Sequence, residues 1–116
     1  MLGRILVVDD NVPLAENIAE VFEFEGFQPV VAASAEEALA LSLARDLAAV
    51  ITDLRLPGLD GAELVTRLRP GREQVRFAVI SAYSDDGTID RARKAGAWFF
   101  PKPLDFDRLA QFVRGL

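Results

Sequence analysis

The sequence contains neither cysteine nor histidine. Without cysteine, the chain cannot form disulfide bonds, use a thiolate nucleophile or build a zinc site from cysteine ligands. The absence of histidine excludes Ser-His and Cys-His catalytic pairs, histidine metal sites and pH switching by an imidazole. Any acid, base or metal-ligating side chain must therefore be Asp, Glu, Lys or a hydroxyl group.

Long apolar runs and an excess of basic residues are also missing. Apolar runs such as residues 5–8 and 47–51 have the length of a strand, far below the ~20 residues that cross a bilayer. Asp9 and Asp10 interrupt the first run too early for a signal peptide. The 13 basic and 18 acidic residues give a net charge of -5, which disfavours nucleic-acid binding. We expect a cytoplasmic protein that binds neither membranes nor nucleic acid directly.

The composition is that of one soluble domain. The chain has 116 residues, of which 51% are hydrophobic and 27% charged, and it shows no internal repeat. We expect a single domain over residues 1–116. The start at Met1 and the end at Leu116 fit either a stand-alone domain or the N-terminal piece of a longer chain with an effector domain.

Segments typical of strands alternate with segments of helical periodicity. Short, mainly apolar runs predict strands at 5–8, where the run is also rich in β-branched residues, and at 28–32, 48–52, 77–80 and 98–100. Apolar spacing and capping residues predict helices at 13–24, 34–44, 64–68, 88–95 and from 105 onward. This alternation predicts a three-layer α/β sandwich, in which helices cover both faces of a five-stranded parallel sheet.

Two helices have a predicted apolar face. In the first helix the face comprises Leu14, Ile18, Val21 and Phe22, and in the last helix it comprises Leu109, Phe112 and Val113. Pro13 suits a first helical turn, Ser34 with Glu37 forms a capping box, and Asp105 can cap the last helix.

Polar residues follow four of the predicted strands, namely Asp9 with Asp10, then Asp53, Ser81 and Lys102. In parallel sheets, ligands bind at the carboxyl ends of the strands, so these side chains should share one edge. Three carboxylates close together are expected to hold a cation or to have raised pKa values. An all-oxygen ligand set indicates a hard ion, and Mg²⁺ fits best.

The same residue types suit phosphoryl chemistry. A carboxylate held against Mg²⁺ can act as a nucleophile and form an aspartyl-phosphate, while a lysine and a serine bind phosphoryl oxygens. Taken singly, an Asp pair after a strand is more often a turn or a cap, and Lys102 alone would be a solvated surface lysine. The joint placement of all these residues at successive strand ends favours a site.

Four segments together resemble the receiver domain of two-component response regulators over essentially the whole chain. They are Ile5–Asp10, Thr52–Gly61, Val79–Ala82, and Gly96-Ala97 leading to Lys102-Pro103. The resemblance implies a flavodoxin-like fold with strand order 2-1-3-4-5 and five helices. It also implies that Asp53 accepts a phosphoryl group from a partner histidine kinase or phosphotransfer protein. Asp9, Asp10 and Asp53, with the backbone carbonyl of Arg55, would hold Mg²⁺.

The resemblance assigns further roles. Ser81 would bind a phosphoryl oxygen on activation, Lys102 would pair with the phosphoaspartate, and the Lys102-Pro103 peptide bond would be cis. The switch aromatic of the family corresponds to Phe99, for which an ordinary core phenylalanine is an equal alternative. Phosphorylation would bias the face made by the fourth helix, fifth strand and fifth helix toward a downstream target, and a phosphorylation-dependent homodimer is possible.

Arg55 and Tyr83 lie two residues beyond Asp53 and Ser81, so both should overhang the phosphorylation pocket. We hypothesise that this pair shields the acyl phosphate from water and lengthens its lifetime. The alternative is that they are two solvated loop side chains.

The main interpretation is a signalling switch that catalyses its own phosphorylation and dephosphorylation but turns over no separate substrate. A Mg²⁺-dependent phosphohydrolase using Asp53 would place a second Asp at position 55, where this chain has Arg55. A flavodoxin-like nucleotide binder needs a phosphate-binding loop after the first strand, but Asp9–Pro13 is acidic. A phosphorylation-independent docking domain is a third alternative. The sequence names neither the kinase nor the downstream target.

Overall fold

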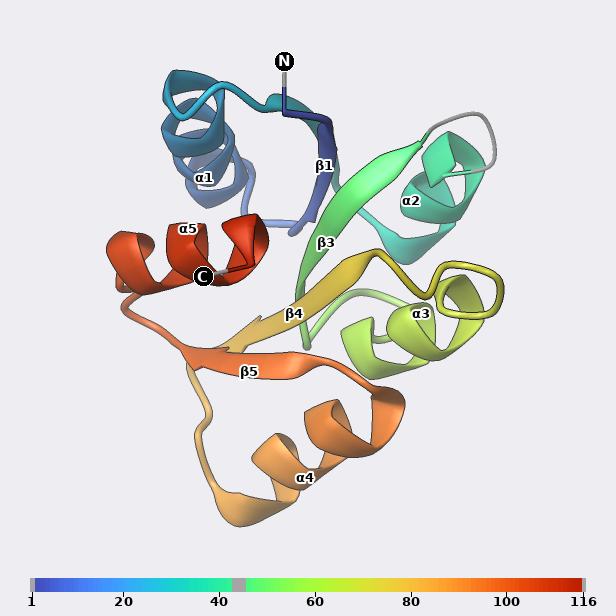
Figure 1. The fold of residues 1–116 in the computed structure, drawn as a ribbon. Coiled ribbons are helices and arrows are strands. Elements are labelled where there is room, and N and C mark those ends of the chain that lie inside the picture. Colours follow the sequence, from blue (N-terminus) through green and yellow to red (C-terminus); the bar gives the residue numbers. More distant parts are fainter. Residues whose placement is uncertain (1, 43–45, 116) are drawn as a thin grey trace.

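The computed structural model describes residues 2–42 and 46–115, in which strands and helices alternate along the chain (Figure 1). The strands are β1 (Arg4–Val8), β2 (Gln28–Ala32), β3 (Leu47–Asp53), β4 (Arg76–Ser81) and β5 (Trp98–Pro101). The helices are α1 (Val12–Phe24), α2 (Ala35–Ser42), α3 (Gly61–Leu68), α4 (Asp86–Ala95) and α5 (Phe106–Arg114). Every predicted element is present, with bounds that differ by a few residues.

All neighbouring strands pair in parallel, in the order β2-β1-β3-β4-β5. The predicted three-layer α/β architecture and strand order are therefore confirmed. β1 and β3 lie side by side, with Val7 opposite Ile51 and Val8 opposite Thr52. This register brings the chain that follows β1 close to Asp53, the last residue of β3.

Helices cover both faces of the sheet, and each face has its own apolar cluster. One cluster joins the sheet to α2, α3 and α4, and the other joins it to α1 and α5 (Figure 1). Within β1, Leu6 and Val8 belong to the first cluster, whereas Ile5 and Val7 belong to the second. A strand buried on both faces requires apolar residues at consecutive positions, which explains its continuous apolar run.

The ends of several helices follow from local hydrogen bonds. The Ser34 hydroxyl accepts the backbone N–H of Glu37 at 3.1 Å, and the Asp105 carboxylate accepts that of Arg108 at 3.2 Å. Both caps were predicted, as was Pro13 in the first turn of α1. Asn11 caps α1 by accepting the N–H of Leu14 at 3.3 Å, which the sequence analysis did not anticipate.

The predicted face of α1 is wrong in part. The buried residues of this helix are Ala15, Ile18 and Phe22, while Leu14 and Val21 are half-buried at the margins of this face. Ala15 belongs to the same buried apolar cluster as Ile18 and Phe22, so the centre of the face is rotated toward it.

The predicted apolar face of α5 is also wrong in part. Leu109, Ala110 and Val113 are the buried residues of this helix, and Phe112 is only half-buried. Phe112 packs sideways against Phe100, at 5.4 Å between ring centroids.

The predicted C-terminal end of α2 reaches into residues 43–45, which lie outside the described residues. The Lys102-Pro103 peptide bond is cis, as the resemblance implied. Among the helices that the structure describes, none is long and apolar enough to cross a membrane.

Candidate functional site

Three carboxylates meet at the carboxyl ends of β1 and β3. Asp9 and Asp10 directly follow β1, and Asp53 ends β3. One oxygen from each of the three lies within 4.8 Å of the other two. The Asp9 and Asp53 side chains are only 1% and 11% exposed, whereas Asp10 is exposed. Two of the three negative charges are therefore largely shielded from water.

Lys102 adds one positive charge to this cluster. Its Nζ atom lies 3.4 Å from Asp53 Oδ1 and 3.4 Å from Asp9 Oδ2. The backbone N–H of Lys102 donates to the carbonyl of Ser81 at 2.9 Å, which fixes the start of the loop after β5 against the end of β4. This contact holds the lysine beside carboxylates that are far away in the sequence.

The electrostatic balance of the cluster favours a bound cation. Burial raises the pKa of Asp53 above its ordinary value of 3.8, and the neighbouring charge of Asp9 raises it further, while Lys102 acts in the opposite direction. The net shift is upward, so one lysine does not compensate for burial and two nearby carboxylates. A divalent cation would supply the missing positive charge.

The donor set at this cluster fits Mg²⁺. It consists of carboxylate oxygens from Asp9, Asp10 and Asp53, without nitrogen or sulfur ligands. One Asp9 oxygen accepts the backbone N–H of Asn11 at 2.9 Å, which fixes the carboxylate in place. Hard cations such as Mg²⁺ prefer a few carboxylate oxygens and retain several waters. Asp10, being exposed, lies where such waters have access.

Ser81 ends β4, beside the end of β3. Its side chain is buried, and its hydroxyl accepts the backbone N–H of Tyr83 at 3.0 Å. The structure therefore brings Ser81 to the same edge of the sheet as Asp53, with its hydroxyl bonded to its own loop. A contact between this hydroxyl and a phosphoryl group remains a prediction.

Arg55 and Tyr83 contact each other across the ends of β3 and β4. The guanidinium carbon of Arg55 lies 4.1 Å from the centre of the Tyr83 ring, in the geometry of a cation–π contact. Both residues are exposed, and Tyr83 keeps 51% of its surface in contact with solvent. They form a stacked pair that remains solvated, and shielding of an acyl phosphate by this pair remains a prediction. Metal binding through the Arg55 carbonyl remains a prediction.

Phe99 is half-buried in β5 and packs against the cluster beneath α2, α3 and α4. Its neighbours Trp98 and Phe100 instead contact Phe112 of α5, on the other side of the strand. Partial burial fits both a switch aromatic and an ordinary core residue, so its role remains a prediction.

Gly61 is a residue of the site that the sequence analysis did not single out. A β-carbon at this position would overlap the main-chain oxygen of Asp53, and the Gly61 N–H donates to the carbonyl of Leu54 at 2.8 Å. The loop after β3 therefore folds back onto the strand end only because position 61 has no side chain. The turn-rich segment Pro57–Gly61 was the available sequence signal, but it did not reveal this close approach.

Comparisons with known proteins support one family. The model of the response regulator receiver domain family matches residues 5–114. The chain is 32% identical over 115 residues to sporulation initiation phosphotransferase F of Bacillus subtilis, covering 98% of this chain and 93% of that protein. It is 38% identical over 109 residues to a response regulator receiver protein of Anaeromyxobacter sp., covering 93% of this chain. The match spans only 46% of the Anaeromyxobacter protein.

Solved structures give the same result. A CheY-like response regulator receiver domain protein from Methanospirillum hungatei superposes with a TM-score of 0.90 at 27% identity, over 99% of this chain and 93% of that one. A response regulator from Burkholderia pseudomallei, crystallised with a phosphorylated aspartic acid, a calcium ion and citrate, gives a TM-score of 0.89 at 28% identity. That match covers 96% of this chain and 66% of the Burkholderia chain.

Proposed function

The chain belongs to the response regulator receiver domain family, and from this premise we propose that it is a phosphorylation-activated switch with Asp53 as the phosphoacceptor. The observation that carries the proposal is the position of Asp53, whose carboxylate lies 3.4 Å from the Lys102 Nζ atom and within 4.8 Å of oxygens of Asp9 and Asp10. This arrangement combines a nucleophilic oxygen, a fixed cation and a divalent-cation site.

In the proposed reaction, a carboxylate oxygen of Asp53 attacks the phosphorus of a phosphohistidine on a partner histidine kinase or phosphotransfer protein. The oxygen–phosphorus bond forms, and the nitrogen–phosphorus bond breaks, which leaves the imidazole on the partner. Mg²⁺, held by Asp9, Asp10, Asp53 and the Arg55 carbonyl, would neutralise charge on the phosphoryl oxygens. The phosphohistidine must lie outside these 116 residues, because they contain no histidine.

Lys102 and Ser81 are assigned to the phosphorylated state. Phosphorylation adds negative charge beside Asp53, and the Lys102 Nζ atom already lies 3.4 Å from one oxygen of that carboxylate. Lys102 would then pair with the phosphoaspartate, and the Ser81 hydroxyl, which accepts from the Tyr83 N–H, would donate its hydrogen to a phosphoryl oxygen. The related Burkholderia structure, with its phosphorylated aspartic acid and calcium ion, supports this chemistry.

A movement of Ser81 would reach α4 through the short loop that joins them. α4 packs against the rest of the molecule through small side chains, because its buried residues are Ala92 and Ala95. An ion pair between Arg91 and Asp60, which caps α3, joins the exposed side of α4 to the loop after β3. We infer that the face formed by α4, β5 and α5 transmits the signal to a downstream protein or effector domain.

Dephosphorylation would require water to reach the acyl phosphate. The stacked side chains of Arg55 and Tyr83 follow Asp53 and Ser81 by two residues each, so they can restrict this access. The protein would thus catalyse its own phosphorylation and dephosphorylation without turning over another substrate. We place it in the cytoplasm, where histidine kinases present their phosphohistidine.

The decisive experiment is labelling with acetyl phosphate, a small phosphoryl donor. The wild type should gain one phosphoryl group by intact-mass spectrometry when Mg²⁺ is present, and none when it is chelated. Asp53→Asn should remain unlabelled, whereas Asp46→Asn, a control at the opposite end of β3, should label like the wild type. Equal labelling of Asp53→Asn would refute the assignment.

The same experiment separates the alternatives. A docking domain that works without phosphorylation would take up no label under any condition. A phosphohydrolase would release inorganic phosphate from p-nitrophenyl phosphate over many turnovers, whereas the proposed switch would not.

A further inference from the structure

Two aromatic side chains are strongly exposed at positions far from the phosphoacceptor. Phe24, the last residue of α1, is 93% exposed, and Trp98, the first residue of β5, is 67% exposed. Single exposed apolar residues are common on protein surfaces. These two differ from such residues because the charged residues near Phe24 are acidic, whereas those near Trp98 are basic.

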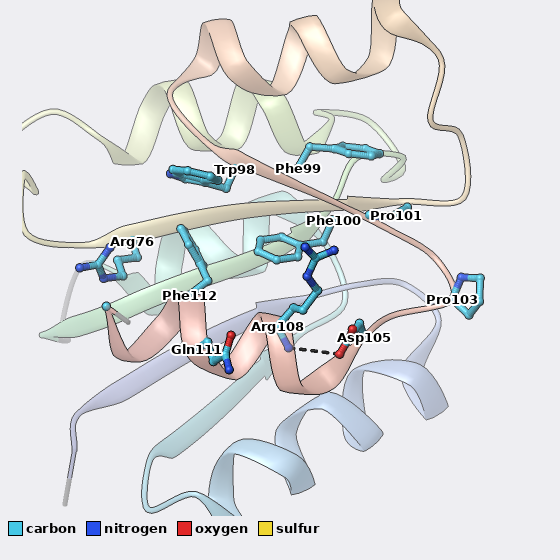
Figure 2. A pocket seen from close by; sticks show the side chains of 11 residues that line it. Arg76, Trp98, Phe99, Phe100, Pro101, Pro103, Asp105, Arg108, Gln111 and Phe112 are labelled. Carbon is cyan, nitrogen blue, oxygen red and sulfur yellow. Dashed lines mark hydrogen bonds between the residues drawn. The ribbon is translucent and has the colours of Figure 1, made fainter.

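Trp98 lies beside a cavity of about 470 Å³ between β5 and α5 (Figure 2). Its ring centroid is 5.7 Å from that of Phe112, which in turn lies 5.4 Å from that of Phe100. The three rings form an aromatic wall, and the described residues leave the cavity open to solvent. A cavity of this size accepts an aromatic side chain.

Arginines border this wall. The guanidinium carbon of Arg76 lies 5.9 Å from the ring centroid of Phe112, and the side chain of Arg108 extends toward Phe100 (Figure 2). Asp105 also lines the cavity, but its carboxylate caps α5. We call this site the aromatic groove and define it by Arg76, Trp98, Phe100, Arg108 and Phe112. Its basic rim contrasts with the net charge of -5 of the whole chain.

The charged neighbours of Phe24 along the chain are acidic. Glu20 and Glu23 are exposed on the last turns of α1, and Glu25 follows Phe24 directly. We call Glu20, Glu23 and Phe24 the acidic plug. It presents an aromatic ring flanked by carboxylates, which is the chemistry that the aromatic groove would recognise.

The groove runs along α5 from Asp105 to Gly115, and its Gly115 end lies near the plug. Glu25, next to Phe24, forms an ion pair with Arg114 in the last turn of α5, and the following residue, Gly115, lines the groove cavity. A two-fold axis close to this end of α5 would therefore allow two copies to exchange plugs. Such reciprocal contacts close into a dimer rather than a filament.

We propose that this protein forms a symmetric dimer in which Phe24 of each copy inserts into the aromatic groove of the other, with Glu20 and Glu23 facing Arg76 and Arg108. This contact would bury both exposed aromatic side chains and pair charges of opposite sign. It uses none of the residues of the phosphoacceptor site, so failure of the phosphotransfer proposal would leave it standing. It does share β5 and α5 with the face proposed above to transmit the signal.

Sedimentation velocity and fluorescence over a concentration series test the proposal directly. Trp98 is the only tryptophan, so its emission reports on the groove alone. We expect dimer formation and a blue shift of the emission to rise together with concentration. Phe24→Ala should weaken association at least tenfold. Val12→Ala, which changes another exposed apolar residue at the opposite end of α1, should leave association unchanged.

A charge exchange tests the pairing itself. E20R/E23R makes plug and groove both basic, and R76E/R108E makes both acidic, so each variant alone should remain monomeric. An equimolar mixture should form a heterodimer, because both of its contacts then join opposite charges. If R76E/R108E does not fold by circular dichroism, R108E replaces it, since Arg108 is exposed on α5.

Three results would overturn the proposal. One is a wild type that stays monomeric at every concentration, as expected if the groove instead binds an acidic segment of another protein. Another is a dimer that persists in Phe24→Ala or forms without a change in Trp98 emission. The third is a mixture of the folded charge variants that remains monomeric.

Discussion

Replacing Asp53 with asparagine should stabilise the metal-free protein, although it removes the proposed phosphoacceptor. Asparagine retains the size of the side chain and eliminates its charge. At an effective dielectric constant of about 20, two like charges about 4.8 Å apart repel by about 3.5 kcal/mol, and opposite charges about 3.4 Å apart attract by about 5 kcal/mol. Asp53 has two carboxylate neighbours within 4.8 Å and one lysine nitrogen at 3.4 Å.

The two repulsions exceed the single attraction by about 2 kcal/mol, before the unfavourable burial of the charge is counted. We therefore expect Asp53→Asn to raise the free energy of unfolding at pH 7 by about 1–2 kcal/mol. Lys102 keeps Asp9 as a partner in this variant, so no buried charge is left unpaired.

The pH dependence has a definite sign. The pKa of Asp53 is raised in the folded protein above 3.8, so the folded state favours the protonated carboxyl group. The wild type is therefore not destabilised by the Asp53 charge below about pH 4, which is the pKa of this carboxyl group in the unfolded chain. The destabilisation develops as the pH rises through the higher pKa that Asp53 has in the folded protein. The stabilities of variant and wild type should converge in acid and separate toward neutrality.

Urea denaturation followed by circular dichroism measures this difference, in chelator and in Mg²⁺. Magnesium should stabilise the wild type more than the variant, because the variant has lost a ligand. Asp46→Asn, an exposed change outside the cluster, should match the wild type in both conditions. An Asp53→Asn protein that is no more stable than the wild type in chelator at pH 7 would refute the electrostatic argument.

Three further predictions concern neighbours of Asp53. Lys102→Met should lower the stability of the metal-free protein by about 1–3 kcal/mol in urea denaturation, because two carboxylates lose their cation. Tyr83→Ala should shorten the lifetime of the phosphorylated protein several-fold in a phosphate-release assay. Tyr83→Phe retains the ring and should leave the lifetime unchanged. An unchanged lifetime in Tyr83→Ala would defeat the shielding hypothesis. Gly61→Ala should destabilise the protein by about 2–3 kcal/mol by forcing the loop away from Asp53, while Gly87→Ala in α4 should be neutral or stabilising in the same assay.

The sequence alone was sufficient for the order and type of the elements. Continuous apolar runs such as that of β1 indicate strands buried on both faces, and such strands alternating with helices require a parallel sheet. In that topology all strands end at one edge, so Asp9, Asp53 and Ser81 had to lie near each other. The caps Ser34 and Asp105 were also predictable, because a cap depends on residues three positions apart.

The distances between the side chains at that edge, and the burial of each, depended on the packing of the whole chain. Asp9 and Asp10 are adjacent and chemically identical, yet one is buried and the other exposed, because the direction of each side chain follows from the turn after β1. The contact of Lys102 with Asp9 joins residues separated by 93 positions. The stacking of Arg55 on Tyr83 likewise requires the loops after β3 and β4 to meet.

Two features show most clearly where sequence reasoning ends. Helical periodicity placed Phe112 on the apolar face of α5, but the aromatic residues of β5 draw it to the edge of the sheet, where it helps to form the aromatic groove. Position 61 needs glycine because a β-carbon there would overlap the main-chain oxygen of Asp53. Local patterns determined which elements form and where they end, because these depend on interactions between near neighbours in the sequence. Only the tertiary structure decided how closely side chains approach, because that depends on how every layer packs against the next.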